Sequence, residues 1–308
     1  MPFPDRPLRL GTRGSPLALA QAHMVGEALR AAHDWPQEAI ATVIVQTSGD
    51  RIQDRALADI GGKALWTKEL DRALVEGEID CAVHSMKDVE TLRPAEIAIA
   101  AMLPRADVRD RLIGTDSLAS LPADPIVGTS SPRRAAQVLR LRPDARIVLF
   151  RGNVATRLAK LEAGEVHATL LAAAGLDRLG QSEIGVEMPI ELMLPAPAQG
   201  AVGIETLAAD ATMRDLLGAI SHAPTFDCVM AERAVLRGLG GTCHSPIAAL
   251  ARLDSGAIHL LAEIINPDGK ETVSDEARIA RGDEAAALAL GRALLSRASP
   301  TLRALFEP

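Results

Sequence analysis

The sequence predicts an α/β fold followed by a smaller unit of helices and antiparallel strands. Three observations support this prediction. The 308 residues are enough for two or three compact domains. A strand, a Ser-Pro pair and a helix follow one another twice, once near residue 12 and once near residue 130. After Thr225, a helix leads into strands separated by short turns, which is typical of an antiparallel meander.

The first occurrence of the strand, Ser-Pro and helix pattern lies near the N-terminus. Leu8 and Leu10 indicate a short strand, and Ser15 and Pro16 fit the cap and the first position of a helix. Arg13 therefore lies at a strand-to-helix turn. In α/β sheets such turns carry ligand sites, because backbone N–H groups and the positive end of the helix dipole attract anions.

A charged pair follows a later strand of the same domain. The elements predicted before it are a strand over residues 42–45, a helix over about 66–76 and a strand over 79–83. Lys87 and Asp88 come directly afterwards. They are either an exposed ion pair with a capping role, or an ammonium that binds an anionic ligand beside a carboxylate that acts in catalysis. We interpret the neighbouring His84 as a structural residue.

The second occurrence of the pattern marks a second domain. After a strand over residues 97–102, the charged residues 105–111 are predicted to cross over, and the new domain begins near Leu112. Ser131 and Pro132 then fit the start of a helix whose first turn holds Arg133 and Arg134. Two cations there oppose the helix dipole, which suggests that a bound anion compensates them. A solvated surface pair is the alternative.

Six arginines are predicted to line one crevice. They follow parallel strands or lie in the first turn of the next helix, and they are Arg13, Arg133, Arg134, Arg151, Arg157 and Arg178. Asn153 fits the cap of the helix that carries Arg157. In a chain of formal charge −7, such a cluster implies a ligand with several carboxylates or phosphates. The glycine motifs of nucleotide-binding loops are missing from the sequence.

The rest of the chain is predicted to return to the first domain and then to form the third unit. Residues 195–200 read as a stiff connector, and the strand over 201–205 and the helix over about 209–220 are expected to rejoin the first domain. The third unit contains a helix over 225–239, strands over 247–253, 257–265 and 271–279, and a closing helix from about Asp283.

Cys243 lies in the short loop between the helix and the first strand of the third unit. Gly240 fits the end of that helix, so the loop is tight, and a thiol placed there suits a nucleophile or an attachment point. The alternative is a small buried hydrophobe. That alternative fits Cys81 and Cys228 better, because both lie within apolar patterns.

Composition excludes several classes of function. The chain is 48% hydrophobic but only 2% aromatic and has no tyrosine, which argues against binding of single-stranded nucleic acid. Its negative charge gives no field that attracts nucleic acid or membrane. Three cysteines without paired spacing argue against a disulfide framework and a metal site. The N-terminus lacks an apolar signal core and no run is long enough to cross a membrane, so we expect a cytoplasmic protein.

Five runs of residues resemble the porphobilinogen deaminase (hydroxymethylbilane synthase) family. They are RGSPLAL at 13–19, HSMKDV at 84–89, VGTSSPRR at 127–134, RGNVATRL at 151–158 and GTC at 241–243. The resemblance extends from Leu8 to about Leu250 and thins in the C-terminal strands. It implies three domains, residues 1–103 with 199–220, residues 104–198, and residues 221–308. The first two would resemble a two-lobed type II periplasmic binding fold, and the third would be a smaller α+β domain with a three-stranded sheet.

The resemblance also implies an activity in porphyrin and heme biosynthesis. A dipyrromethane cofactor, built from the enzyme's own substrate, would be attached to Cys243 through a thioether. Four porphobilinogen molecules would then be condensed head to tail, each with loss of ammonia, and hydroxymethylbilane would be released by hydrolysis. We expect a monomer that passes its product to uroporphyrinogen-III synthase.

Site residues follow from the resemblance position by position. Asp88 matches the family's catalytic aspartate, which would hydrogen-bond pyrrole N–H groups and stabilise a cationic intermediate. The residues implied to bind the cofactor are Cys243, Lys87, Asp88, Ser131, Arg133, Arg134 and Arg157. Those implied to bind substrate or the growing chain are Arg13, Ser15, Gln21, Thr129, Arg151, Asn153, Arg157, Arg178 and Gln199. The loop after Thr242 reads Cys-His-Ser rather than the family's Cys-Gln-Val.

Two other classes of function compete with this interpretation. A non-catalytic protein that binds a small polyanion on the same two-lobed fold would not need Cys243. A cysteine-dependent acyl or phosphoryl transferase would need a base near the thiol, and His244 is the only local candidate.

Overall fold

The computed structural model describes residues 6–46, 64–240 and 245–306, except for the side chains of residues 64–66. The chain folds into two compact units. The first comprises Met1–Ala106 and Gly200–Phe226, and the second comprises Asp107–Gln199 and Asp227–Pro308. No helix in the described part of the chain is long and apolar enough to cross a membrane.

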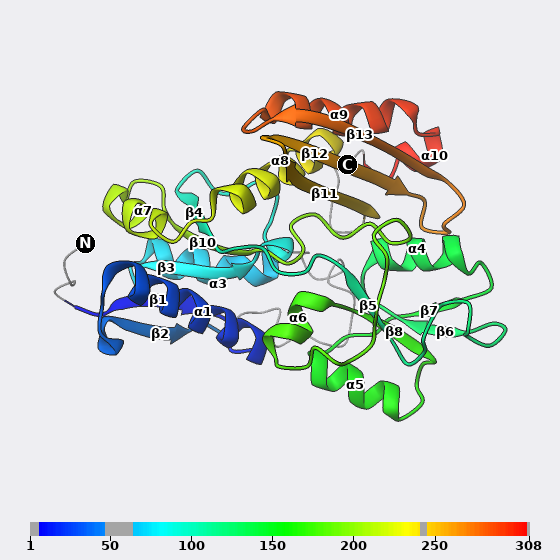
Figure 1. The fold of residues 1–308 in the computed structure, drawn as a ribbon, viewed down its shortest axis with the longest axis horizontal. Helices are drawn as coiled ribbons and strands as arrows, with labels where there is room; N and C mark the ends of the chain where they lie inside the picture. The colour runs from blue at the N-terminus through cyan, green and yellow to red at the C-terminus, as the bar shows by residue number, and fades with distance from the viewer. Residues whose placement is uncertain (1–5, 47–63, 241–244, 307–308) are drawn as a thin grey trace. The chain divides into compact units, whose positions relative to one another are not determined.

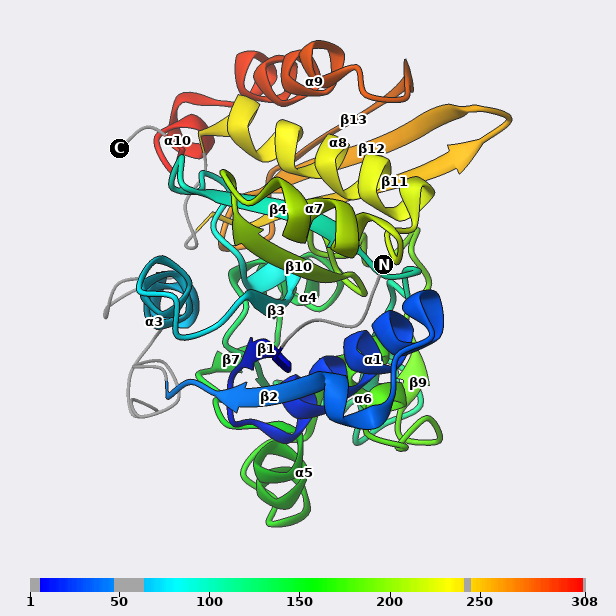
Figure 2. The same cartoon turned by 90° about the vertical axis from the view of Figure 1, so that its left-hand side faces the viewer.

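The first unit contains a five-stranded mixed sheet. Its elements are β1 (Leu8–Thr12), α1 (Pro16–His33), β2 (Ile40–Ile44), α3 (Ala64–Val75), β3 (Cys81–Ser85), β4 (Ile97–Met102), β10 (Val202–Leu207) and α7 (Ala211–Gly218). The strand order is β2-β1-β3-β10-β4. Strand β1 is parallel to β2 and β3, whereas β10 is antiparallel to β3 and β4. Helix α7 lies against the β10 and β4 end of this sheet (Figure 2).

The position of β10 confirms that the chain returns to the first sheet after the connector. Its residues Val202 and Ile204 join Leu10, Val25 and Val83 in one buried apolar cluster. Burial of this cluster stabilises the pairing of strands that are more than a hundred residues apart in the chain.

The second unit contains another five-stranded mixed sheet, with the order β7-β6-β8-β5-β9. Its elements are β5 (Asp110–Ile113), β6 (Ile126–Gly128), α4 (Pro132–Leu141), β7 (Arg146–Val148), α5 (Val154–Glu162), β8 (Ala168–Ala172), α6 (Ala173–Arg178) and β9 (Val186–Glu187). Strand β6 is parallel to β7 and β8, and β5 is antiparallel to β8 and β9. Both sheets therefore combine parallel strands with one antiparallel return strand.

The charged segment before Leu112 was predicted as a crossing, and this prediction was wrong for Asp110 and Arg111. Both residues belong to β5 and are buried. Their charges are compatible with a buried strand because each has partners. Asp110 binds two arginines, and Arg111 lies 3.2 Å from the carboxylate of Asp177. The two-residue strand β9 was not predicted at all.

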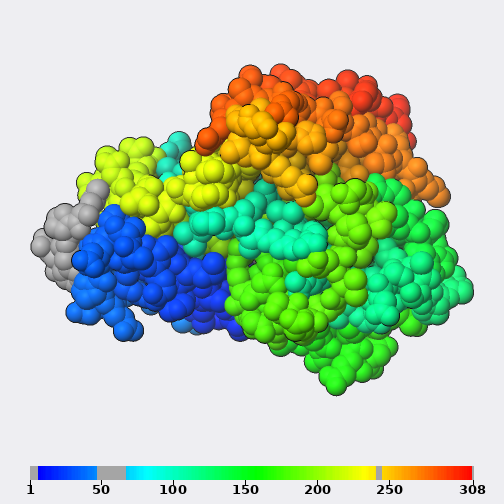
Figure 3. Space-filling model, viewed as in Figure 1, coloured from blue at the N-terminus to red at the C-terminus, as the bar shows by residue number. Residues whose placement is uncertain are grey.

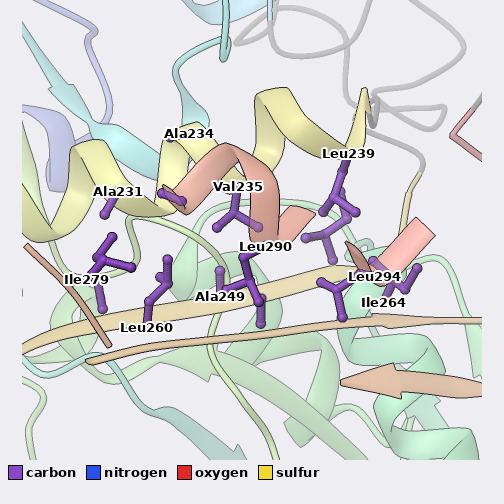
Figure 4. Close-up of a cluster of buried hydrophobic side chains, with 14 of the residues drawn as sticks. Ala231, Ala234, Val235, Leu239, Ala249, Leu260, Ile264, Ile279, Leu290 and Leu294 are labelled. Carbon is purple, nitrogen blue, oxygen red and sulfur yellow. The ribbon is translucent and has the colours of Figure 1, made fainter. Parts of the chain in front are cut away.

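The C-terminal elements of the second unit form an antiparallel sheet covered by helices. They are α8 (Ala223–Leu239), β11 (Ile247–Asp254), β12 (Ala257–Ile265), β13 (Thr272–Ala280), α9 (Glu284–Arg297) and α10 (Pro300–Arg303), with the strands in sequential order. Figure 3 shows these strands and α9, coloured orange to red, as one continuous region of the surface. Figure 4 shows that the core between them joins Val235 and Leu239 of α8, Leu260 and Ile264 of β12, and Leu290 of α9.

The predicted α/β class with a three-stranded C-terminal sheet is confirmed (Figure 1). The middle and the C-terminal sheets each have a hydrophobic cluster of their own, although both belong to the second compact unit. The boundaries of the three domains stay a prediction.

Candidate functional site

The first unit contains a pocket at the carboxyl ends of the parallel strands β1 and β3. Arg13, Ser15, Gln21, Ser85 and Asp88 line it. Ser15 caps α1, since its hydroxyl accepts a hydrogen bond from Ala18 N at 3.3 Å, and Pro16 occupies the first helical position as predicted. The Ser-Pro signal thus explains why Arg13 is held at the mouth of a helix, where anions are favoured.

The turn that follows β3 carries the predicted catalytic residue. Lys87 and Asp88 belong to a single 3-10 turn, Met86–Asp88, and both are partly buried. Met86 anchors the turn, because its side chain is buried and its N–H donates to the carbonyl of Ala201 at 3.0 Å. On the other side, the buried amide of Gln21 donates to the hydroxyl of Ser85 at 2.8 Å. Asp88 is therefore presented to the pocket by a rigid strand end.

His84 is a structural residue, as interpreted from the sequence. Its Nε2 lies 3.1 Å from a carboxylate oxygen of Glu205, whose side chain is fully buried and also accepts two hydrogen bonds from Arg93. Burial by itself raises the pKa of Glu205, but His84 and Arg93 lower it to about 2. This ionised network joins β3 to β10 beneath the pocket.

In the second unit, Arg133 and Arg134 lie at the start of α4, where Ser131 caps the helix. Both guanidinium groups are buried and both bind Asp110. Arg133 Nη2 donates to one carboxylate oxygen at 2.8 Å, and Arg134 Nη2 donates to the other at 2.7 Å. The anion expected to compensate the arginine pair thus includes a carboxylate of the protein itself. The alternative of a solvated surface pair is wrong, because both side chains are buried.

Asp110 is the residue that sequence reasoning missed. Its side chain is completely buried and also accepts a hydrogen bond from the amide of Gln199 at 2.9 Å. Burial alone raises the pKa of Asp110, but the charges of Arg133 and Arg134 hold it well below its usual range. The signal in the sequence was a lone Asp inside a four-residue apolar and charged run, which does not identify a partner.

The arginine pair leaves capacity for an anionic ligand. One carboxylate opposes two guanidinium charges at Asp110, and among the described residues Arg133 Nε is buried without a hydrogen-bond partner. A buried N–H and a surplus positive charge are what a carboxylate-bearing ligand would satisfy. The donors therefore fit a dipyrromethane group that carries carboxylates.

The other predicted residues of the second unit are distributed over three strand ends. Thr129 follows β6, where its hydroxyl accepts a hydrogen bond from Ser131 N at 3.1 Å. Asn153 caps α5 by accepting from Thr156 N at 2.9 Å, and Arg157 Nε donates to the carbonyl of Gly152 at 2.9 Å. Arg151 precedes this cap and is partly buried.

The predicted location of Arg178 in the first turn of a helix was wrong. It is the last residue of α6, because that short helix begins directly at the end of β8 without a connecting loop. Burial lowers the pKa of Arg178, and the neighbouring Asp177 opposes this shift.

The cysteines divide as the apolar patterns predicted. Cys81 and Cys228 are buried, and burial raises the pKa of the Cys81 thiol well above its usual range. Cys243 and His244 lie outside the described residues. Gly240 does end α8, with a φ of 66°. No group of acidic, histidine and cysteine side chains in the described ranges could hold a metal ion.

These features define an α/β protein with a polar pocket at the parallel strand ends of one unit, buried cationic donors in the other and an antiparallel C-terminal sheet. Residues 8–215 match the family model described as porphobilinogen deaminase, dipyromethane cofactor binding domain. Residues 226–298 match the model of the porphobilinogen deaminase C-terminal domain. The chain belongs to the porphobilinogen deaminase family, as its five sequence runs indicated.

Curated relatives agree with this assignment. A porphobilinogen deaminase from Sphingopyxis alaskensis is 57% identical over 98% of each chain. One from Paracoccus denitrificans is 49% identical over 90% of this chain and 89% of the relative. A chloroplastic porphobilinogen deaminase from Oryza sativa subsp. japonica is 50% identical over 88% of this chain and 77% of the relative.

Solved structures with detectable similarity are more distant. Substrate binding domain 2 of GlnP from Lactococcus lactis covers 78% of this chain, over 93% of its own length, with 8% identity and a TM-score of 0.43. A periplasmic binding protein from Silicibacter pomeroyi covers 69% of this chain, over 88% of its own length, with 17% identity and a TM-score of 0.38.

Proposed function

We propose that this chain is a transferase of porphyrin and heme biosynthesis, a hydroxymethylbilane synthase that condenses four porphobilinogen molecules head to tail. The observation that carries the proposal is the pocket of the first unit, in which Asp88 is the only carboxylate among the lining residues and Arg13 is the cation. This pocket lies within the part of the chain that matches the cofactor-binding family model. Membership of that family does not favour the non-catalytic polyanion-binding alternative.

The chemistry of the substrate fits these two side chains. Porphobilinogen carries an acetate, a propionate, a pyrrole N–H and an aminomethyl group. In each condensation the aminomethyl C–N bond breaks as ammonia leaves, a C–C bond forms to a free pyrrole carbon, and that carbon loses its proton. Arg13 would attract the carboxylates, whereas Asp88 would accept hydrogen bonds from pyrrole N–H groups, stabilise the developing positive charge and assist the proton transfer.

The dipyrromethane cofactor would supply the first two rings, to which substrate units are added. We propose that Cys243 holds it through a thioether, and that Lys87, Asp88, Ser131, Arg133, Arg134 and Arg157 bind it. Support comes from the surplus positive charge at Asp110 and the buried Nε of Arg133. Ser131 would contribute a hydroxyl at a helix N-terminus, where carboxylates are stabilised.

Further residues would bind substrate and the elongating chain. We assign this role to Arg13, Ser15, Gln21, Thr129, Arg151, Asn153, Arg157, Arg178 and Gln199. Gln199 would act through the arginine pair, because its amide already donates to Asp110. We also propose a cytoplasmic monomer that passes hydroxymethylbilane to uroporphyrinogen-III synthase.

The first test is the intact mass of the denatured purified protein, compared with Cys243→Ser. We expect an excess equal to two linked porphobilinogen-derived units in the unvaried protein and none in the variant, because only a thiolate forms the thioether. Cys228→Ser is the matched control, since Cys228 is buried in the core of the second unit. An unmodified mass that persists after incubation with porphobilinogen would contradict the proposed tether and the polymerising mechanism.

A further inference from the structure

A carboxylate of the C-terminal sheet reaches the helix that carries the arginine pair. Glu263 lies on β12 and its side chain is almost completely buried. One of its oxygens accepts a hydrogen bond from the amide of Gln137 at 2.6 Å, and the other accepts one from Arg140 Nη1 at 2.9 Å. Both donors belong to α4. All of these residues lie within the second compact unit.

Gln137 extends this contact to Arg133. Its amide oxygen accepts a hydrogen bond from Arg133 Nη1 at 2.8 Å, while Nη2 of the same guanidinium donates to Asp110 at 2.8 Å. The carbonyl of Leu194 accepts from both Gln137 and Arg133, at 2.9 and 3.0 Å. The result is a continuous buried chain of hydrogen bonds from Glu263 to Asp110.

The order of donors and acceptors in this chain depends on Glu263. A glutamine amide has nearly the same shape in its two orientations, so its neighbours decide which end faces which way. An ionised Glu263 can only accept, and it therefore selects the NH2 end of Gln137. The oxygen of Gln137 then faces Arg133, which can only donate. Reversal of the amide would set donor against donor at Arg133 and acceptor against acceptor at Glu263.

Charge and packing support the same arrangement. Burial lowers the pKa of Arg133, and the charges of Asp110 and Glu263 oppose this shift. The β12–β13 turn lies beside α4 (Figure 1), and a Cβ on Gly269 in this turn would meet the backbone nitrogen of Arg140 at 2.4 Å. The C-terminal sheet is therefore held against α4 too closely for Glu263 to shift freely.

We propose that Glu263 is a positioning residue for Arg133: it orients Gln137, and through it aims the guanidinium at the site that binds the cofactor's carboxylates. This inference rests on the proposed function, because it assumes that Arg133 serves the cofactor. It makes the C-terminal sheet a contributor to cofactor loading through β12 as well as through its cysteine loop.

The test compares Glu263→Gln with Glu276→Gln. Glu276 is on the neighbouring strand β13, where its exposed carboxylate binds His259. Two quantities are measured: the rate at which cofactor-free protein gains mass with porphobilinogen, and the 15N signal of the Arg133 side chain, assigned with Arg133→Lys. We expect E263Q to load about tenfold more slowly and to shift the Arg133 signal, with neither change in E276Q.

An exchange of the two side chains, Glu263→Gln with Gln137→Glu, restores an acceptor opposite Arg133 and a donor opposite residue 137. We expect this double variant to fold even if E263Q does not, and to load within about threefold of the unvaried protein. A loss of packing alone would not be recovered in this way.

Three results would overturn the proposal: loading by E263Q at the rate of E276Q, slow loading with an unchanged Arg133 signal, or a double variant that loads no faster than the single ones. Failure of the proposed function looks different. In that case the unvaried protein gains no mass at all, and the Arg133 signal alone then decides whether Glu263 positions this side chain.

Discussion

At the scale of single residues, the site depends on a few ionised groups with different degrees of burial. Asp88 is partly buried at a pocket, whereas Asp110 and Glu205 are fully enclosed among arginines and, for Glu205, a histidine. An enclosed carboxylate stabilises its partners, and a carboxylate in a pocket is available to a ligand. This difference in environment distinguishes a catalytic acid from a structural one, although all three are single letters in the sequence.

We expect Asp88→Ala to lower turnover of porphobilinogen by on the order of 100-fold or more, because it removes the carboxylate assigned to charge stabilisation and proton transfer. The fold should persist, since the side chain lines a pocket and is not part of a core cluster. Ammonia release and thermal unfolding would be measured together. Asp215→Ala, at an exposed position of α7, is the control. Near-normal turnover by D88A would remove Asp88 from its assigned role.

At the scale of elements, α4 is positioned from both ends. Ser131 caps its N-terminus, and the β12–β13 turn packs against its C-terminal half at Gly269. Gly269 has a φ of 74°, and an added Cβ would also approach the carbonyl oxygen of Ala136 at 2.8 Å. The turn therefore requires glycine for both its conformation and its contact with the helix.

Gly269→Ala should consequently reduce the free energy of unfolding by more than Gly256→Ala. Gly256 has a φ of 83° but nothing within 4 Å of the added Cβ, so its substitution costs only about 1 kcal/mol of backbone strain. At Gly269 the clash with α4 adds roughly 1–3 kcal/mol. Urea unfolding of the two variants measures the difference. Equal losses would mean that the turn does not pack tightly on α4.

At the scale of the whole molecule, each compact unit contains a buried carboxylate whose pKa is lowered by cations. Asp110 has this role in the second unit, and Glu205 in the first. Because the folded state binds protons less readily than the unfolded state, both groups contribute stability that is complete above their ordinary pKa. That contribution is lost as the pH falls toward the folded-state value.

Acid should therefore destabilise the protein, and Glu205→Gln should remove part of this dependence. The pKa of Glu205 falls from 4.5 to about 2, so its contribution of roughly 3 kcal/mol is present above pH 4.5 and is lost between pH 4.5 and 2. The difference in unfolding free energy between the unvaried protein and E205Q should shrink over that interval. Glu96→Gln, at an exposed position, should leave the dependence unchanged. A constant difference for E205Q would contradict the assigned cause.

Much of the local structure could be predicted because its signals are local. Ser15 with Pro16, and Ser131 with Pro132, begin helices as expected, since a capping hydroxyl and a fixed proline φ act within one turn of the chain. Gly240 ends α8 for an equally local reason. Family membership was likewise carried by short runs of residues that are contiguous in the sequence.

What the sequence by itself determined was thus the class of fold, the family and the residues at the strand ends, including Asp88 and Arg13. Only the tertiary structure decided that Asp110 belongs to a strand and pairs with Arg133 and Arg134, and that Glu263 reaches the same network. The physical reason is range. Caps and periodicity act over a few residues, whereas a buried carboxylate is stabilised by whichever cations and donors the fold brings to it, and here Gln137, the partner of Glu263, lies 126 positions away in the chain.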